Sequence, residues 1–224
     1  MHGQRPCCPA RSCVGVRLVI MSVLECLSTE KRSQILAGAA KVFAEEGYEG
    51  ASMSRIAHEA SVSKGTLYNH FQNKADLFSV YVQNACSTYL SHVFSNVKED
   101  GAPEEVLLSV ADRMLTMMTD PACIVIYRVV MAEAAKFPNV AQTFYQAGPA
   151  EAIKRLTLWL TGAAADGRLM VEDPQFAAEQ FLALVQTRTG LRRRLCLDHD
   201  VDPAFRDYVV RETVRMFLNR YAPA

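Results

Sequence analysis

The side chains best suited to act on another molecule lie close together, between Ser52 and Phe71. They carry hydroxyl, ammonium, amide and imidazole groups in a short run: Lys64, Thr66, Tyr68, Asn69 and His70. Hydroxyls and a helix N-terminus donate hydrogen bonds to phosphate oxygens, while asparagine and lysine can read base edges. Gly65 lets a phosphate or base edge approach the backbone closely. The run therefore indicates contact with nucleic acid.

Two short helices joined by a tight turn would position these groups. Ser52 is placed to cap the first helix, and Ser63 to cap a second helix that starts at Lys64. Apolar residues of the first helix recur at helical spacing on one face: Met53, Ile56, Ala57 and Ala60. Ser61 and Val62 would form the turn, and Leu67 and Phe71 would point to the core. This pattern predicts a helix-turn-helix.

A simpler interpretation is a helical hairpin with an ordinary polar surface, because capped helix pairs are common. Charge gives only local support for DNA binding. The chain has 24 basic and 24 acidic residues, yet residues 61–74 hold two lysines, one histidine and no acid. Phosphate contacts would therefore depend on hydroxyls and backbone N–H groups, with a modest dependence on salt.

The motifs from Thr29 to Phe78 resemble, without a gap, the DNA-binding domain of TetR-type transcriptional regulators. The matching pieces are Glu46-Gly47-Tyr48, Ser52-Met53, Ile56-Ala57, Val62-Ser63-Lys64-Gly65-Thr66-Leu67-Tyr68, His70-Phe71 and Asn73-Lys74. The resemblance implies a first long helix whose inner face is Ile35, Ala39, Val42 and Phe43. It also implies that Gly47 ends that helix in a left-handed conformation. Asn73 would cap a fourth helix, with Asp76 completing a box-like cap.

The resemblance and the residue types together predict the DNA-contacting set. These residues are Ser52, Ser54, Arg55, Ser63, Lys64, Gly65, Thr66, Tyr68, Asn69, His70 and Lys74. Two of them depart from the family pattern. Asn69 stands where an aromatic residue or histidine is frequent, and could read adenine or touch only phosphate or water. Arg55 stands where an acid is frequent, and could contact DNA or lie in solvent.

The rest of the chain predicts an all-α protein, because its apolar patterns are helical and strand signals are nearly absent. We expect an N-terminal three-helix helix-turn-helix domain, joined by a long helix to a helical ligand-binding and dimerisation domain. The predicted divisions are a disordered extension at 1–27, a DNA-binding domain at 28–78 and a sensor domain at 79–224. Met21 is an alternative start to Met1. Residues 128–197 resemble the C-terminal domain of AefR-like TetR regulators, in pieces such as Phe137-Pro138 and Asp173-Pro174.

Methionine and aromatic side chains of the second half could line an adaptable apolar pocket for a small-molecule effector. The candidates are Met114, Met117, Met118, Tyr127, Met131, Phe144 and Trp159. Such stripes are also what an ordinary core contains. Arg128 and Glu133 interrupt an apolar helix, where they could anchor a polar ligand group, pair with another helix or reach solvent.

Two helices, at about 174–195 and 202–221, offer broad apolar faces that the resemblance assigns to a four-helix dimer interface. The candidates are Phe176, Gln180, Phe181, Leu184, Thr187, Tyr208, Val209, Thr213, Met216 and Phe217. A twofold homodimer would place two recognition helices in successive major grooves of double-stranded DNA. Its operator would then be nearly palindromic.

Other classes of site find little support. The seven cysteines form no paired CxxC units and no histidine lies at zinc-ligand spacing, so we expect no metal and no cofactor. The apolar stretch 18–24 is too short to span a membrane, which favours the cytoplasm. Without a G-x-S-x-G elbow or a phosphate loop, an enzyme is not expected. The leading hypothesis is a ligand-responsive repressor, and the alternative is an architectural or division-linked DNA-binding protein without an inducer.

Overall fold

The protein is built from helices. The computed structural model describes residues 13–95, 97–187, 189–195, 197 and 202–223, with side chains from Thr29 onward except those of 193 and 194. The elements are α1 (Cys13–Gly50), α2 (Met53–Glu59), α3 (Lys64–His70), α4 (Lys74–Val93), α5 (Pro103–Thr119), α6 (Pro121–Glu133), α7 (Pro138–Tyr145), η1 (Gln146–Ala150, a π-helical turn), α8 (Glu151–Ala165), α9 (Pro174–Val185), α10 (Thr189–Arg194) and α11 (Pro203–Tyr221). No strand occurs in these ranges, and the predicted all-α class is confirmed.

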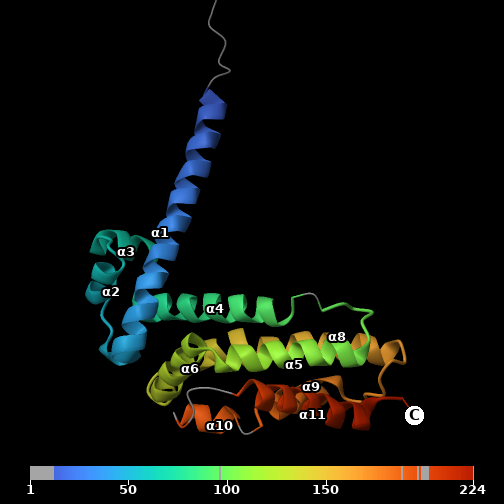
Figure 1. Ribbon diagram of the computed structural model, residues 1–224. Coiled ribbons are helices and arrows are strands. Elements are labelled where there is room, and N and C mark those ends of the chain that lie inside the picture. Colours follow the sequence, from blue (N-terminus) through green and yellow to red (C-terminus); the bar gives the residue numbers. More distant parts are fainter. Residues whose placement is uncertain (1–12, 96, 188, 196, 198–201, 224) are drawn as a thin grey trace, which may run out of the picture.

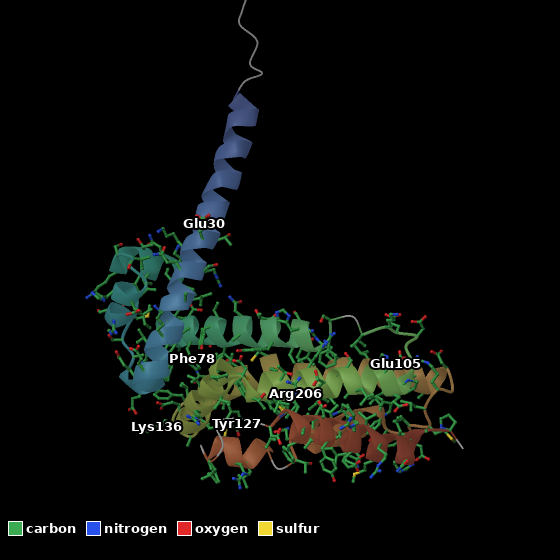
Figure 2. All side chains as sticks on the ribbon, in the orientation of Figure 1. Glu30, Phe78, Glu105, Tyr127, Lys136 and Arg206 are labelled. Atoms are coloured by element: carbon green, nitrogen blue, oxygen red, sulfur yellow. The ribbon has the colours of Figure 1, made fainter. Side chains whose placement is uncertain are left out.

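Helix α1 crosses one end of α4, with α2 and α3 packed beside it (Figure 1). Helix α4 leads from this unit into the larger part of the molecule. There α5 and α8 form a layer beneath α4, and α9 and α11 form a further layer beneath them (Figure 1). The ion pair of Arg206 with Asp112 ties α11 to α5, and Arg206 is labelled in Figure 2.

The helices of the helix-turn-helix unit start at the capping side chains that the sequence predicts. The side chains of Ser52, Ser63 and Asn73 accept hydrogen bonds from the N–H groups of Arg55, Thr66 and Asp76. Proline occupies the first turn of α5, α6, α7, α9 and α11, where its missing N–H costs nothing. Local chemistry thus sets most of the helix starts.

Two hydrophobic cores hold the fold together. One lies among α4, α5, α8, α9 and α11, and includes Leu107, Leu160 and Phe181. The other includes the inner face of α1 that the resemblance implied, Ile35, Ala39, Val42 and Phe43, which is fully buried. This second core extends beyond the helix-turn-helix unit, because Ile126 and Val130 of α6 and Val140 of α7 belong to it. The DNA-binding unit is therefore packed directly on α6 and α7.

Two boundaries differ from the predicted ones. Of the extension predicted as disordered, residues 1–12 lie outside the described part of the chain, but 13–27 have a helical backbone within α1. No proline or glycine interrupts 16–37, so the supported helix can continue toward the N-terminus. The helix predicted at 174–195 is divided into α9 and α10. Thr187, Thr189 and Gly190 have low helix propensity at that division.

No single helix in the described ranges has both the length and the hydropathy needed to cross a membrane. In the part of the chain that the structure describes, α5 and α6 taken as a pair reach that limit, and they are bent by 67° relative to each other.

Candidate DNA-binding surface and cavity

Helix α3 presents its polar face outward, as the sequence predicts. Leu67 and the following Phe71 are fully buried in the core shared with α1 and α4. The opposite face leaves Lys64, Gly65 and Asn69 exposed, and the ring of Tyr68 is 53% exposed although it is large and aromatic. An exposed tyrosine beside an exposed lysine and asparagine is available for a duplex groove.

A tight turn fixes the angle between α2 and α3. Ser61 has a positive φ of 52°, and its N–H donates to the carbonyl of His58 at 3.0 Å. The Val62 N–H donates to the carbonyl of Ala57 at 3.0 Å, which completes a Schellman motif at the end of α2. Val62 packs on the core from this turn. The predicted turn at Ser61 and Val62 is thus present.

Close contact with α1 supports the same turn. A Cβ atom on Gly38 would lie only 2.7 Å from the backbone nitrogen of Ala60, so only glycine fits at this crossing. The side-chain amide of Gln34 donates to the Ala60 carbonyl at 2.6 Å. Helix α1 therefore holds the end of α2 through both shape and hydrogen bonding.

Several predicted DNA-contacting hydroxyls already have partners within the protein. Ser52 and Ser63 accept from backbone N–H groups, and Ser63 Oγ lies 2.8 Å from Thr66 Oγ1. Ser54 is exposed and His70 is half-buried against Phe71. The predicted DNA-contacting residues that remain exposed without such a contact are Lys64, Tyr68 and Asn69, together with Gly65 and Ser54.

Arg55 and Lys74 both have partners within the protein, and their contact with DNA stays a prediction. The guanidinium of Arg55 is paired with Glu46 at 3.2 Å, Glu59 at 2.9 Å and Glu45 at 3.5 Å. The ammonium of Lys74 donates to the carbonyls of Glu49 and Ala51, each at 2.9 Å. Both side chains thus fix α2 and α4 relative to α1 instead of facing outward freely.

A cavity of about 330 Å³ lies among α4, α5, α6, α7, α8, α9 and α10. Five of the predicted pocket residues line it: Met114, Met117, Met118, Tyr127 and Phe144. Met131 and Trp159 do not. Met131 lies on the outer face of α6, where it is 57% exposed, and Trp159 lies in the core, where its Nε1 donates to the Lys98 carbonyl.

The sequence reasoning missed the walls of the cavity that α4, α9 and α10 supply. They include Cys86, Tyr89, Glu179, Gln186 and Thr189, together with Cys123 of α6. Cys86 and Leu90 share the apolar face of α4 with Val82, so helical spacing was the available signal. Only the packing of α9 and α10 could show that those helices close the same space.

Few polar groups face this cavity. Among the lining residues that the structure describes, none is lysine, arginine or histidine, and Glu179 is the single acid. The Tyr89 hydroxyl donates to Asp120 Oδ1 at 2.7 Å, and the same oxygen accepts from the N–H groups of Ala122 and Cys123. Burial raises the pKa of the Cys86 thiol to about 11 and that of Cys123 to about 12, so both remain neutral thiols.

The predicted dimer residues divide between a surface and a core. Phe176, Gln180, Tyr208 and Met216 are exposed on α9 and α11, Leu184 is half-buried on α9, and Thr187 is exposed in the turn after α9. Phe181, Val209, Thr213 and Phe217 are instead buried in the chain's own core, where Phe181 and Phe217 meet at 5.2 Å. These four are too buried to contact a partner, because both helices turn that face toward α5 and α8. A shallow groove runs between α9 and α11, lined by Gln180, Leu184, Met216 and Tyr221.

Within the described ranges, no group of three or more histidine, cysteine, aspartate or glutamate side chains is arranged to hold a metal ion.

An exposed recognition helix on a helix-turn-helix, joined by α4 to a helical domain with its own cavity, defines a class of DNA-binding transcriptional regulators. Comparison with known proteins gives the family. A family model described as bacterial regulatory proteins, tetR family, matches residues 35–80. A second model, described as the C-terminal domain of an AefR-like transcriptional repressor, matches residues 105–223. The chain belongs to the TetR family of transcriptional regulators, as its sequence motifs predict.

Individual relatives agree with this assignment. The chain is 42% identical to an HTH-type transcriptional regulator of Staphylococcus aureus (strain USA300) over 71 residues, which are 32% of the chain and 38% of that relative. The flavonoid-responsive regulator FrrA is 30% identical, with a TM-score of 0.77 over 87% of the chain and 98% of its own. A TetR family regulator from Pseudomonas syringae pv. tomato is also 30% identical, with a TM-score of 0.71 and the same shares of both chains.

Proposed function

We propose that this protein is a ligand-responsive repressor that binds a near-palindromic operator as a homodimer. The observation that carries the proposal is the presence of both required parts in one chain. Helix α3 exposes Lys64, Tyr68 and Asn69, and α4 runs from that unit to the cavity, where Cys86, Tyr89 and Leu90 form one wall. A protein that acts on DNA in this way belongs in the cytoplasm.

The dimer is supported by the outward faces of α9 and α11. Phe176, Tyr208 and Met216 are large apolar side chains left exposed beside a groove, a combination that marks interaction surfaces. A twofold axis through this face would pair two copies of α3, and each copy would read one half of the operator.

The effector is proposed to be a small, largely apolar molecule with an aromatic ring. Methionine thioethers and the rings of Tyr127 and Phe144, which pack at 6.1 Å, can surround such a ring. Among the described lining residues none is basic, so this part of the cavity wall favours an uncharged effector over a carboxylate or phosphate. The similarity to a flavonoid-responsive regulator makes flavonoids the first compounds to test.

Repression would end when the effector favours a conformation in which the two recognition helices no longer match the groove spacing. The size of the effect is set by the difference in effector affinity between the DNA-bound and released conformations. The alternative, a DNA-binding protein of the same fold without an inducer, predicts a filled core. The cavity of about 330 Å³ favours the ligand-responsive hypothesis over it.

The test begins with selection of a duplex from random DNA by the purified full-length protein. We expect a near-palindromic site whose affinity falls with salt, and loss of binding by the double variant Lys64→Ala/Tyr68→Ala. Lys64→Ala alone should lower the slope of log affinity against log salt by about 1. Lys154→Ala is the matched control, because Lys154 is an exposed lysine on α8. Failure of the wild type to select any site would contradict the proposal.

The second arm adds the flavonoid quercetin to the complex of protein and selected duplex. We expect release of the duplex at quercetin concentrations that also raise the melting temperature. Ala152→Phe places a ring into the cavity wall and should abolish the response, while Ala165→Phe on the exposed end of α8 should not. If quercetin still released the duplex from the Ala152→Phe variant, the effector would not act through this cavity.

A further inference from the structure

The chain leaves the helical conformation at Gly47, near the end of α1, and residues 47–52 form the α1–α2 connection, which is held from two sides. On one side Lys74, at the start of α4, binds the carbonyls of Glu49 and Ala51. On the other side Glu133, the last residue of α6, accepts the N–H of Glu49 on its Oε1 at 3.1 Å. The connection leads directly into the cap of α2, so its position sets the placement of the helix-turn-helix.

Glu133 is an unusual residue for this location. Its side chain is only 8% exposed, and its Oε2 is buried without a hydrogen-bond partner. Burying a carboxylate with one oxygen unpaired is costly, so a packing role alone would be served better by an apolar residue. The hydrogen bond to the Glu49 N–H is the specific contact that this carboxylate makes across 84 residues of sequence.

Neighbouring contacts bring α6 and the connection together at the same place. The rings of Tyr48 and Phe137 meet edge to face at 4.9 Å, and Lys136 pairs with the carboxylate of Glu49 at 2.6 Å. Figure 2 shows Lys136 at the corner where α6 passes the end of α1. Gly47 leaves the helical conformation here, with φ 71° and ψ −178°, and a Cβ at Gly47 would lie 3.9 Å from Glu133 Oε1.

The same helix forms a wall of the cavity. Cys123, Ile126 and Tyr127 line the cavity, and Glu133 follows Ile126 by seven residues, which is about two turns or roughly 10 Å along α6. Helix α6 therefore has the cavity along its first half and the α1–α2 connection at its end. A rigid element of this kind is one of the means by which two sites in a protein are coupled.

We propose that Glu133 is the positioning residue through which α6 orients the helix-turn-helix for DNA. The inference rests on the proposed function for its DNA readout. The hydrogen bond from the Glu49 N–H to the Glu133 carboxylate holds the α1–α2 connection at a fixed position relative to the cavity wall.

The test uses the full-length protein with Glu133→Met, which removes the acceptor, and Glu133→Gln, which keeps one. For Glu133→Met we expect faster amide hydrogen exchange in the peptide covering 47–52 and about tenfold weaker binding to the duplex selected by wild type. Exchange in α5 and α8 should stay as in wild type. Glu133→Gln should restore both the protection and most of the affinity.

Lys136→Met is the matched control at the same corner. It removes the exposed ion pair with Glu49 but leaves the Glu133 hydrogen bond, so affinity should stay within about threefold of wild type. If the amides of 47–52 in Glu133→Met exchanged as slowly as in wild type, the inference would be overturned. Faster amide exchange throughout the chain would overturn it as well, because Glu133 would then stabilise the whole fold and not this connection. If wild type selected no duplex, the proposed function would fail, and the exchange measurement would still decide the role of Glu133.

Discussion

Neighbouring residues decide what a charged side chain of this protein does. Lys64 and Lys74 are both lysines of the helix-turn-helix region, yet Lys64 is exposed while Lys74 binds two backbone carbonyls. Arg55 is likewise taken up by three glutamates. Because exposed ion pairs are weak, these contacts matter mainly for orientation. The local positive charge near α3 is therefore smaller than a count of basic residues indicates.

At the scale of residues, the two cavity thiols predict how the stability of the protein depends on pH. Their pKa values, about 11 for Cys86 and about 12 for Cys123, lie above the ordinary value of 9.0. Between pH 9 and 11 the unfolded chain loses these protons while the folded protein keeps them, so stability falls as pH rises. We expect a loss of about 1.4 kcal/mol per pH unit for each thiol in the free energy of unfolding.

Denaturant titrations at pH 8, 9.5 and 10.5 measure this slope. The double variant Cys86→Ala/Cys123→Ala should show a shallower fall, whatever its absolute stability. The two proteins should have equal slopes between pH 6 and 8, where neither thiol titrates. Equal slopes above pH 9 as well would mean that burial does not hold these protons.

At the scale of elements, contacts between helices position the recognition helix as much as its own sequence does. Capping by Ser52, Ser63 and Asn73 sets where α2, α3 and α4 begin. Their mutual angles depend on the Schellman turn at Ser61 and on the close crossing of Gly38 with Ala60. Because the crossing leaves no room for a methyl group, an alanine at position 38 tests this geometry directly.

Gly38→Ala should push α2 away from α1. A Cβ there would meet Ala60 atoms at 2.7 to 2.9 Å, so we expect a cost of about 1–3 kcal/mol and weakened operator binding. Gly162→Ala, in the last turn of α8, is the control, because nothing lies within 4 Å of its Cβ. That change should add about 0.5–1 kcal/mol of stability, since alanine favours helix. Thermal denaturation measures the stability of each variant, and duplex binding measures its affinity for the operator. A Gly38→Ala variant with wild-type stability and affinity would contradict the close contact between Gly38 and Ala60.

For the whole molecule, the proposed function requires two copies of α3 at a fixed separation, and the outward faces of α9 and α11 are the proposed dimer interface. The four predicted interface residues that are buried within one chain show how the helices are divided. Phe181, Val209, Thr213 and Phe217 are buried within one chain, while Phe176, Tyr208 and Met216 are exposed at the proposed interface.

Met216→Glu should separate the subunits without unfolding them. Met216 is 61% exposed and lies in the groove between α9 and α11, so a buried charge would be introduced only on association. We expect a monomer in sedimentation experiments and loss of operator binding, with the melting temperature as the check on folding. Leu158→Glu on α8, at 65% exposure, should remain dimeric. A dimeric Met216→Glu would place the interface elsewhere.

The sequence by itself determined the helix-turn-helix, its caps, its buried faces and the family, because these depend on residues within one or two helical turns. The run from Ser52 to Phe71 therefore has the predicted form. Only the tertiary structure decided which charges are free, which methionines reach the cavity, which dimer candidates are core and what Glu133 contacts. Each of these depends on helices distant in sequence, whose packing angles no local pattern encodes.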